Sequence, residues 1–171
     1  MMRRALLTIA FLLIGASVFL AGASSAPPSQ TEAQLLARLQ KENDPVRKSK
    51  DETRLARLKL GQTIQAYEHG NIEQGAQLVR GYLGRIKNAW QILRSSGRNA
   101  ARDSRGFKEL DIELREDTRL LEDLERRISY FDRDPIQKAE KEIEQVRVEV
   151  IQALFPVTRA PEAAKPLGKT D

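Results

Sequence analysis

The chain has 171 residues, with 29 Lys and Arg against 24 Asp and Glu, one His and no Cys. Without Cys it has no disulfide, Cys-ligated metal or thiol nucleophile, and one His cannot form a His-based metal cage, so we expect neither a metal nor a cofactor. Charged residues make up 31%, and Gly and Pro number only 10 and 7, a composition typical of one domain of long, solvated helices.

The first 23 residues have the three-part pattern of a secretory signal peptide. Two Arg within the first four residues precede an uncharged, mostly apolar stretch at 5–20, and small residues follow at 21–23. We expect cleavage after Ala23, with a second site after Ala26, and export to the periplasm or the extracellular space. The alternative is an uncleaved N-terminal helix that anchors the rest of the chain outside the cytoplasm.

A short helix should follow a flexible leader at 24–30 that contains two Pro. Ser29 and Glu32 have the spacing of a capping box, which predicts that this helix begins there and ends near Asn43. Its apolar residues are Ala33, Leu35, Leu36 and Leu39.

The next two helices should form a hairpin. Asp44-Pro45 predicts the start of the second helix, because Pro is tolerated in a first helical turn, and Ser49 opens a competing capping box. The helix should end at His69-Gly70, and Asn71 should cap the third helix, which should stop at 95–97. Apolar residues of the third helix recur at steps of four and three, a heptad stripe that comprises Ile72, Ala76, Val79, Leu83, Ile86, Trp90 and Leu93.

A second hairpin should follow a polar loop at 95–106, which lacks any apolar periodicity. The fourth helix has its own heptad stripe, which comprises Phe107, Leu110, Leu114, Asp117, Leu121, Leu124, Ile128 and Phe131. Asp134 should cap the fifth helix, with Pro135 in its first turn, and Phe155-Pro156 should end it.

These elements predict an all-α fold. We expect an antiparallel helical bundle at 31–155, built from two long, coiled-coil-like hairpins and a short N-terminal helix. Two extended hairpins that dimerise are the competing architecture. Residues 156–171 contain Pro and no periodicity, so we expect a disordered tail.

The two hairpins carry opposite charge. Residues 45–106 contain 13 basic and 5 acidic residues, a net charge of +8, whereas residues 107–155 contain 9 and 14, a net charge of −5. One interpretation is that the hairpins attract each other, within one bundle or between subunits. The other is that the basic surface binds an anionic partner such as a lipid head group, an envelope polymer or nucleic acid.

The loop between the hairpins is the candidate anion-contacting patch. Its guanidinium groups suit phosphate or carboxylate, and they belong to Arg94, Arg98, Arg102 and Arg105. The alternative is a solvated linker. No aromatic residue lies among these Arg residues, so we do not expect nucleic acid as a partner.

Asp117 occupies an inward heptad position, where an unpaired carboxylate is costly. We expect the apolar stripe to shift to Leu120-Leu121 and to leave Asp117 at its margin. The alternatives are a register-setting pair with a basic residue on a facing helix and a role in proton handling.

Four other residues in the first hairpin are conspicuous. Trp90 lies on the apolar stripe and should belong to the core. Gly81 and Gly84 indicate a close helix crossing or a conformationally soft stretch. His69 should serve the turn rather than bind a metal.

No motif indicates catalysis, so we expect an exported, non-enzymatic binding or scaffolding protein of the cell envelope. Its partner should be a protein, either a second copy of the chain or an envelope protein that docks as a helix in a groove. In size, export signal and lack of Cys the chain is similar to small periplasmic helical chaperones, a likeness of architecture that implies a chaperone-like role. The alternative function is binding of anionic lipid or polymer through the basic hairpin and the Arg-rich loop.

Overall fold

The computed structural model describes residues 31–156, and this range is all-α, as the sequence predicts. No helix in it is long and apolar enough to cross a membrane. The expected signal peptide, the leader and the tail after Pro156 lie outside the described residues. The helices are α1 (Glu32–Lys41), α2 (Pro45–Glu68), α3 (Ile72–Ser95), α4 (Phe107–Arg127) and α5 (Asp134–Leu154), with a 3-10 turn at Tyr130–Asp132 before α5.

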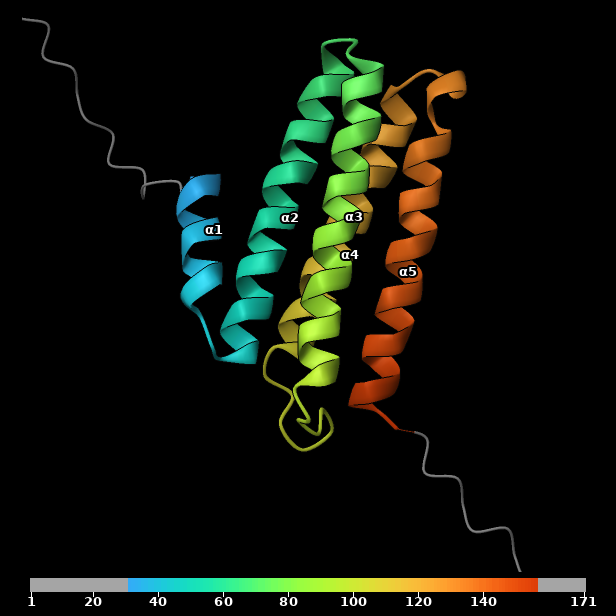
Figure 1. Ribbon diagram of the computed structural model, residues 1–171. Coiled ribbons are helices and arrows are strands. Elements are labelled where there is room, and N and C mark those ends of the chain that lie inside the picture. The colour runs from blue at the N-terminus through green and yellow to red at the C-terminus, as the bar shows by residue number, and fades with distance from the viewer. Residues whose placement is uncertain (1–30, 157–171) are drawn as a thin grey trace, which may run out of the picture.

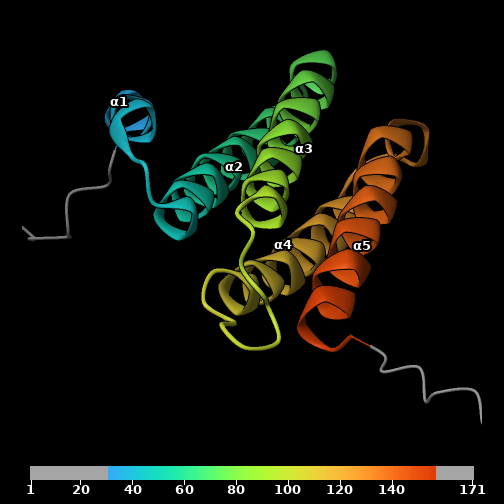
Figure 2. The same ribbon diagram turned by 60° about the horizontal axis from the view of Figure 1, so that its bottom comes forward.

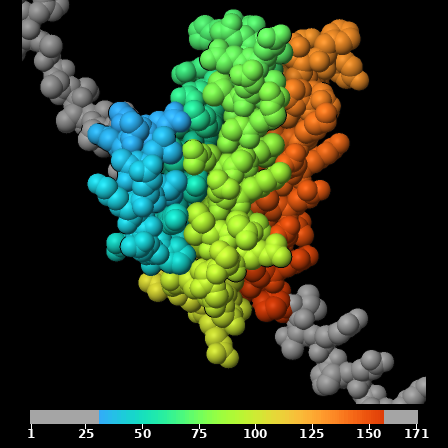
Figure 3. Space-filling model, in the orientation of Figure 1, coloured from blue at the N-terminus to red at the C-terminus, as the bar shows by residue number. Residues whose placement is uncertain are grey.

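The helices form two hairpins that lie against each other. α2 and α3 run side by side in opposite directions, and α4 and α5 form the second pair (Figure 1). Both hairpin turns lie at one end, whereas the α1–α2 connection and the loop at 96–106 lie at the other (Figure 1). α1 packs outside the four long helices, along α2 (Figures 2 and 3).

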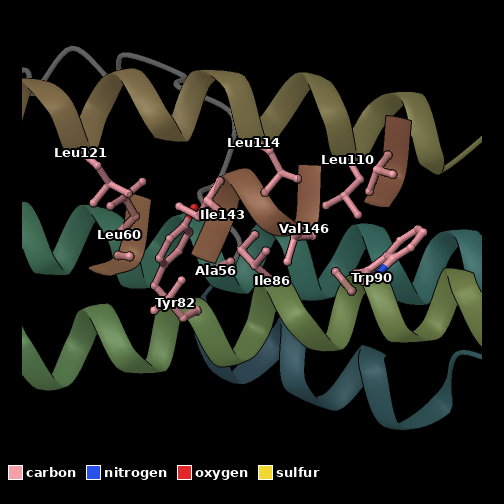
Figure 4. Packing of buried hydrophobic residues seen from close by; sticks show 14 of the residues in the cluster. Ala56, Leu60, Tyr82, Ile86, Trp90, Leu110, Leu114, Leu121, Ile143 and Val146 are labelled. Atoms are coloured by element: carbon pink, nitrogen blue, oxygen red, sulfur yellow. The ribbon is translucent and has the colours of Figure 1, made fainter. Parts of the chain in front are cut away.

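Side chains from all four long helices meet in one hydrophobic core (Figure 4). The heptad stripes of α3 and α4 supply much of it, as predicted. Tyr82 was not among the predicted core residues, yet it is fully buried beside Ile86. The heptad stripe of α4 predicts that Phe131 faces inward, but Phe131 is 90% exposed, because α4 ends at Arg127 and the chain continues into the 3-10 turn.

Local hydrogen bonds explain where α1 and α2 begin. Thr31, rather than Ser29, caps α1: its Oγ1 accepts from the Gln34 amide at 3.4 Å, and the Gln34 side chain accepts from the Thr31 amide at 3.1 Å. Asp44 caps α2 by accepting from the Arg47 amide at 2.8 Å, so the first of the two predicted starts is correct.

Two predicted caps differ from the structure. Asn71 precedes α3 as expected, but its side chain makes no capping hydrogen bond. Asp134 is the first residue of α5 rather than its cap, because Arg133 already occupies the cap position. Local sequence patterns therefore place these helix starts to within one residue.

Gly75, and neither Gly81 nor Gly84, marks a close approach of helices. A Cβ atom at Gly75 would lie 2.5 Å from Cε2 of Tyr67 in α2, so the aromatic ring occupies the space that a side chain would need. At Gly81 and Gly84, no atom of the described chain lies within 4 Å of such a Cβ. The predicted close crossing at these two residues is wrong, because both are exposed.

Ion pairs between the hairpins follow the opposite charges that the sequence shows. Lys87 of α3 pairs with Glu142 of α5, and Arg94 lies 3.5 Å from Glu149 of α5. Arg127 of α4 pairs with Glu68 of α2, and in this pair the basic residue belongs to the acidic hairpin. These contacts agree with the interpretation that the hairpins attract each other within one chain.

Candidate docking groove

An open groove of about 810 Å³ lies between α2 and α4, with α1 at its edge. We call it the α2–α4 groove. Its apolar lining comprises Leu35, Val46, Leu58, Leu110 and Ile112. Ile112 is 53% exposed, one of the few large apolar side chains with so much surface in the described chain. The groove is therefore an apolar surface that the four-helix core does not cover.

Basic residues of α2 line one side of the groove. Arg47, Lys50, Arg54 and Arg57 recur at steps of three, four and three, which places them on one helix face. At 1.5 Å per residue this α2 ridge is about 15 Å long. The same spacing is present in the sequence, but the net charge of +8 for the whole segment does not reveal it.

Acidic residues of α4 line the opposite side. Glu109 and Glu113 are four residues apart, and Glu116 extends the same face by three, so we call this set the α4 ridge. Arg57 bridges the two ridges by pairing with Glu113 and, at 2.9 Å, with Glu116. These ion pairs close one end of the groove.

At the other end of the groove the α2 ridge is open. Arg54 is held 3.2 Å from the buried Asp51 of its own helix. In contrast, the side chains of Arg47 and Lys50 form no ion pair within residues 31–156. Both are exposed, so the open end presents two positive charges without a carboxylate partner.

Gly106 allows α4 to begin directly beside α2. Its φ of 83° lies in the left-handed region, and an added Cβ would be 2.9 Å from Leu93 and 3.3 Å from Val46. The Glu109 carboxylate accepts a hydrogen bond from the Gly106 amide, which fixes the first turn of α4. A larger residue at 106 would thus move the start of α4 away from α2. The end of the groove beside Val46 depends on this contact.

Asp117 lies behind the closed end of the groove and is fully buried. The expectation that it lies at the margin of the core is wrong, because the stripe does not shift: Leu121 is buried and Leu120 only half-buried. The alternative, a pair with a basic residue on a facing helix, is present, since Nε of Arg57 lies 3.9 Å from Oδ1 of Asp117. Tyr82 supplies a second partner for the carboxylate.

The four Arg residues of the candidate anion patch have different surroundings. Arg105 and Arg98 both donate to Asp103, and these hydrogen bonds hold the pKa of that carboxyl well below its usual range. Arg94 points instead to Glu149 of α5. Arg102 is exposed and has no ion pair in the part of the chain that the structure describes. Anion binding by these residues stays a prediction.

Trp90 and His69 lie where the sequence predicts. Trp90 is 8% exposed, packs edge-on against Phe107 with ring centroids 6.1 Å apart, and donates from its indole to Glu149 at 2.7 Å. His69 ends α2, and its Nδ1 lies 2.7 Å from the Gln65 carbonyl oxygen. Within residues 31–156, no group of three or more acidic or His side chains is placed to hold a metal ion.

The groove cannot be recognised from the sequence. Its two ridges belong to segments about 60 residues apart, and only their packing brings them together. No family model, curated protein or solved structure matches the chain.

Proposed function

We propose that the chain is an exported, non-enzymatic binding or scaffolding protein of the cell envelope, which docks a helical protein segment in the α2–α4 groove. The observation that carries the proposal is an open apolar groove bordered by a basic and an acidic ridge. Along α2 it extends from Val46 to Leu58, about 18 Å at the helical rise, which matches about three turns of a docked helix.

The charged side chains of the groove support binding rather than catalysis. Arg57 and Arg54 are held in ion pairs, and Glu109 serves the start of α4. The two remaining cations, Arg47 and Lys50, are exposed and form no ion pair within residues 31–156. Such groups select a charged partner by attraction, whereas a reaction needs groups that converge on one atom.

Docking of a protein accounts for the groove better than binding of an anionic lipid, which is the alternative function. A lipid phosphate near the groove would face Glu109 and Glu113 as well as the α2 ridge. A helix that carries both charge signs can match both ridges. The Arg-rich loop is also partly neutralised, because Asp103 holds two of its guanidinium groups.

The proposal can be tested by replacing Ile112 with a photocrosslinking amino acid and irradiating the cells that make the protein. Val148 of α5 is the matched control, because it is also exposed, at 42%, and does not line the groove. We expect a protein adduct at 112 and none at 148, and we expect the adduct to disappear in R47E/K50E. Equal crosslinking at the two positions, or an adduct that persists in the charge-reversed variant, would overturn the proposal.

A further inference from the structure

We infer that the helical segment that docks in the α2–α4 groove belongs to the same face of a second copy of this chain, in a two-fold symmetric dimer in which α4 of each protomer lies against α2 of its partner. The inference rests on the proposed function and names its partner. It starts from the charges: a single face of the molecule carries both the basic α2 ridge and the acidic α4 ridge. A surface with both signs side by side can be complementary to itself.

The two ridges run in the same direction along the molecule. At the lower end, Val46 of α2 lies beside Gly106, the residue before α4. Eleven residues further along α2, Arg57 pairs with Glu113 and Glu116 of α4. The two helices are therefore parallel in this region (Figure 1).

This direction decides which symmetry axis the charges favour. A two-fold axis along the groove places the α2 ridge of one protomer against the α4 ridge of its partner, so that opposite charges meet. An axis across the groove places the two α2 ridges against each other, and like charges repel. Only the first arrangement brings the unpaired Arg47 and Lys50 to carboxylates, namely the partner's Glu109 and the partner's Glu113.

The apolar residues of the groove fit the same arrangement. Ile112 lies on α4 between Glu109 and Glu113, and more than half of its surface is exposed. In the dimer it would cover part of the partner groove, whose apolar lining includes the half-buried Val46 and Leu58. The contact would therefore bury apolar surface in both protomers at once, which stabilises association.

The molar mass of the exported chain in solution tests this inference. By light scattering at about 100 µM and low salt, a concentration at which a weak but specific interface is populated, the mass should be twice that of the monomer. It should fall toward the monomer value at high salt, which screens exposed charges. R47E/K50E should be monomeric, and circular dichroism should show unchanged helicity, because neither side chain has an ion-pair partner in the described chain.

R80E/R119E is the matched control. It makes the same charge change at two exposed positions of α3 and α4 that do not line the groove, and it should remain dimeric. Loss of the dimer in this control would show that net charge, and not the groove, holds the copies together. A wild-type chain that is monomeric at about 500 µM would also overturn the inference.

Cysteine crosslinking tests the orientation, since the natural chain has no Cys. A mixture of K50C and I112C chains should form crosslinked heterodimers, whereas K50C alone should not, because the two α2 ridges do not meet. Efficient crosslinking of K50C to itself would reject the proposed axis. If the wild-type chain is monomeric while a probe at 112 still captures another protein, the dimer is wrong and the proposed function stands.

Discussion

The hydroxyl of Tyr82 in α3 donates a hydrogen bond of 3.0 Å to Oδ2 of Asp117 in α4, and both side chains are fully buried. Oδ1 of Asp117 accepts no hydrogen bond from residues 31–156, and Nε of Arg57 lies 3.9 Å from it. Burial raises the pKa of Asp117 from 3.8 to about 6, although Tyr82 and Arg57 both act to lower it. Burial, followed by the charge of Asp117, raises the pKa of Tyr82 well above its usual value. When Asp117 is ionised, its buried carboxylate, which joins the two hairpins, therefore lacks a hydrogen-bond donor at one oxygen.

Asp117→Asn should raise the free energy of unfolding at pH 7 by about 1–3 kcal/mol. The pKa of Asp117 is higher in the folded chain than in the unfolded chain, so its carboxyl stabilises the fold fully only below the unfolded pKa, near pH 4. This stabilisation is lost as the pH rises through about 6. Asn stays neutral and still accepts from Tyr82. In urea unfolding from pH 4 to 8, the advantage of the variant over wild type should grow up to about pH 6 and then level off. An advantage that is constant with pH would contradict the assignment.

Tyr82→Phe should lower the free energy of unfolding by about 1–3 kcal/mol at pH 7, because it leaves a buried carboxylate without its hydrogen-bond donor. It should also raise the pKa of Asp117 above 6, since Tyr82 acts to lower that pKa. Carbon-13 NMR of the Asp carboxyl groups measures this shift directly. An unchanged titration of Asp117 in the variant would show that the hydroxyl does not stabilise the charge.

Gly75→Ala and Gly81→Ala should have opposite effects, although both replace Gly by a better helix former within α3. The new methyl group at 75 would overlap the ring of the buried Tyr67 and should cost about 1–3 kcal/mol. The methyl group at 81 points into open space, so the variant should gain up to about 1 kcal/mol from helix propensity. Melting temperatures of the two variants check the prediction, and shifts of the same sign would refute it.

Leu124→Ala and Phe131→Ala should differ strongly in stability, because Leu124 belongs to the core stripe of α4 and Phe131 to the turn beyond it. Leu124 is 0% exposed, so its truncation should cost about 2–5 kcal/mol. Phe131 is almost fully exposed, and its truncation should change stability by less than about 0.5 kcal/mol. Denaturant unfolding provides both values. A large loss at 131 would mean that the aromatic side chain packs against something other than the described chain.

Much of the fold follows from local patterns, but the candidate site does not. The cap at Asp44, the turn before Asn71 and the stop near Ser95 are signals within a few neighbouring residues, so they place three helix ends well. The predicted Arg-rich patch also consists of neighbours in the chain. In the structure Arg94 lies beside a carboxylate of α5, which no local pattern reveals. The groove needs α2 and α4 together, and neither segment indicates the other.

The sequence by itself determined the helical content, most helix boundaries and the opposite charges of the two hairpins, because turn chemistry, apolar periodicity and charge are properties of adjacent residues. The tertiary structure decided that Tyr82 and Asp117 are core residues and that Gly75 is the close approach. The physical reason is that α3 and α4 each pack against more than one helix, so burial depends on partners distant in sequence. The mildly basic net charge of the chain thus becomes a basic ridge beside an acidic one only when α2 and α4 meet.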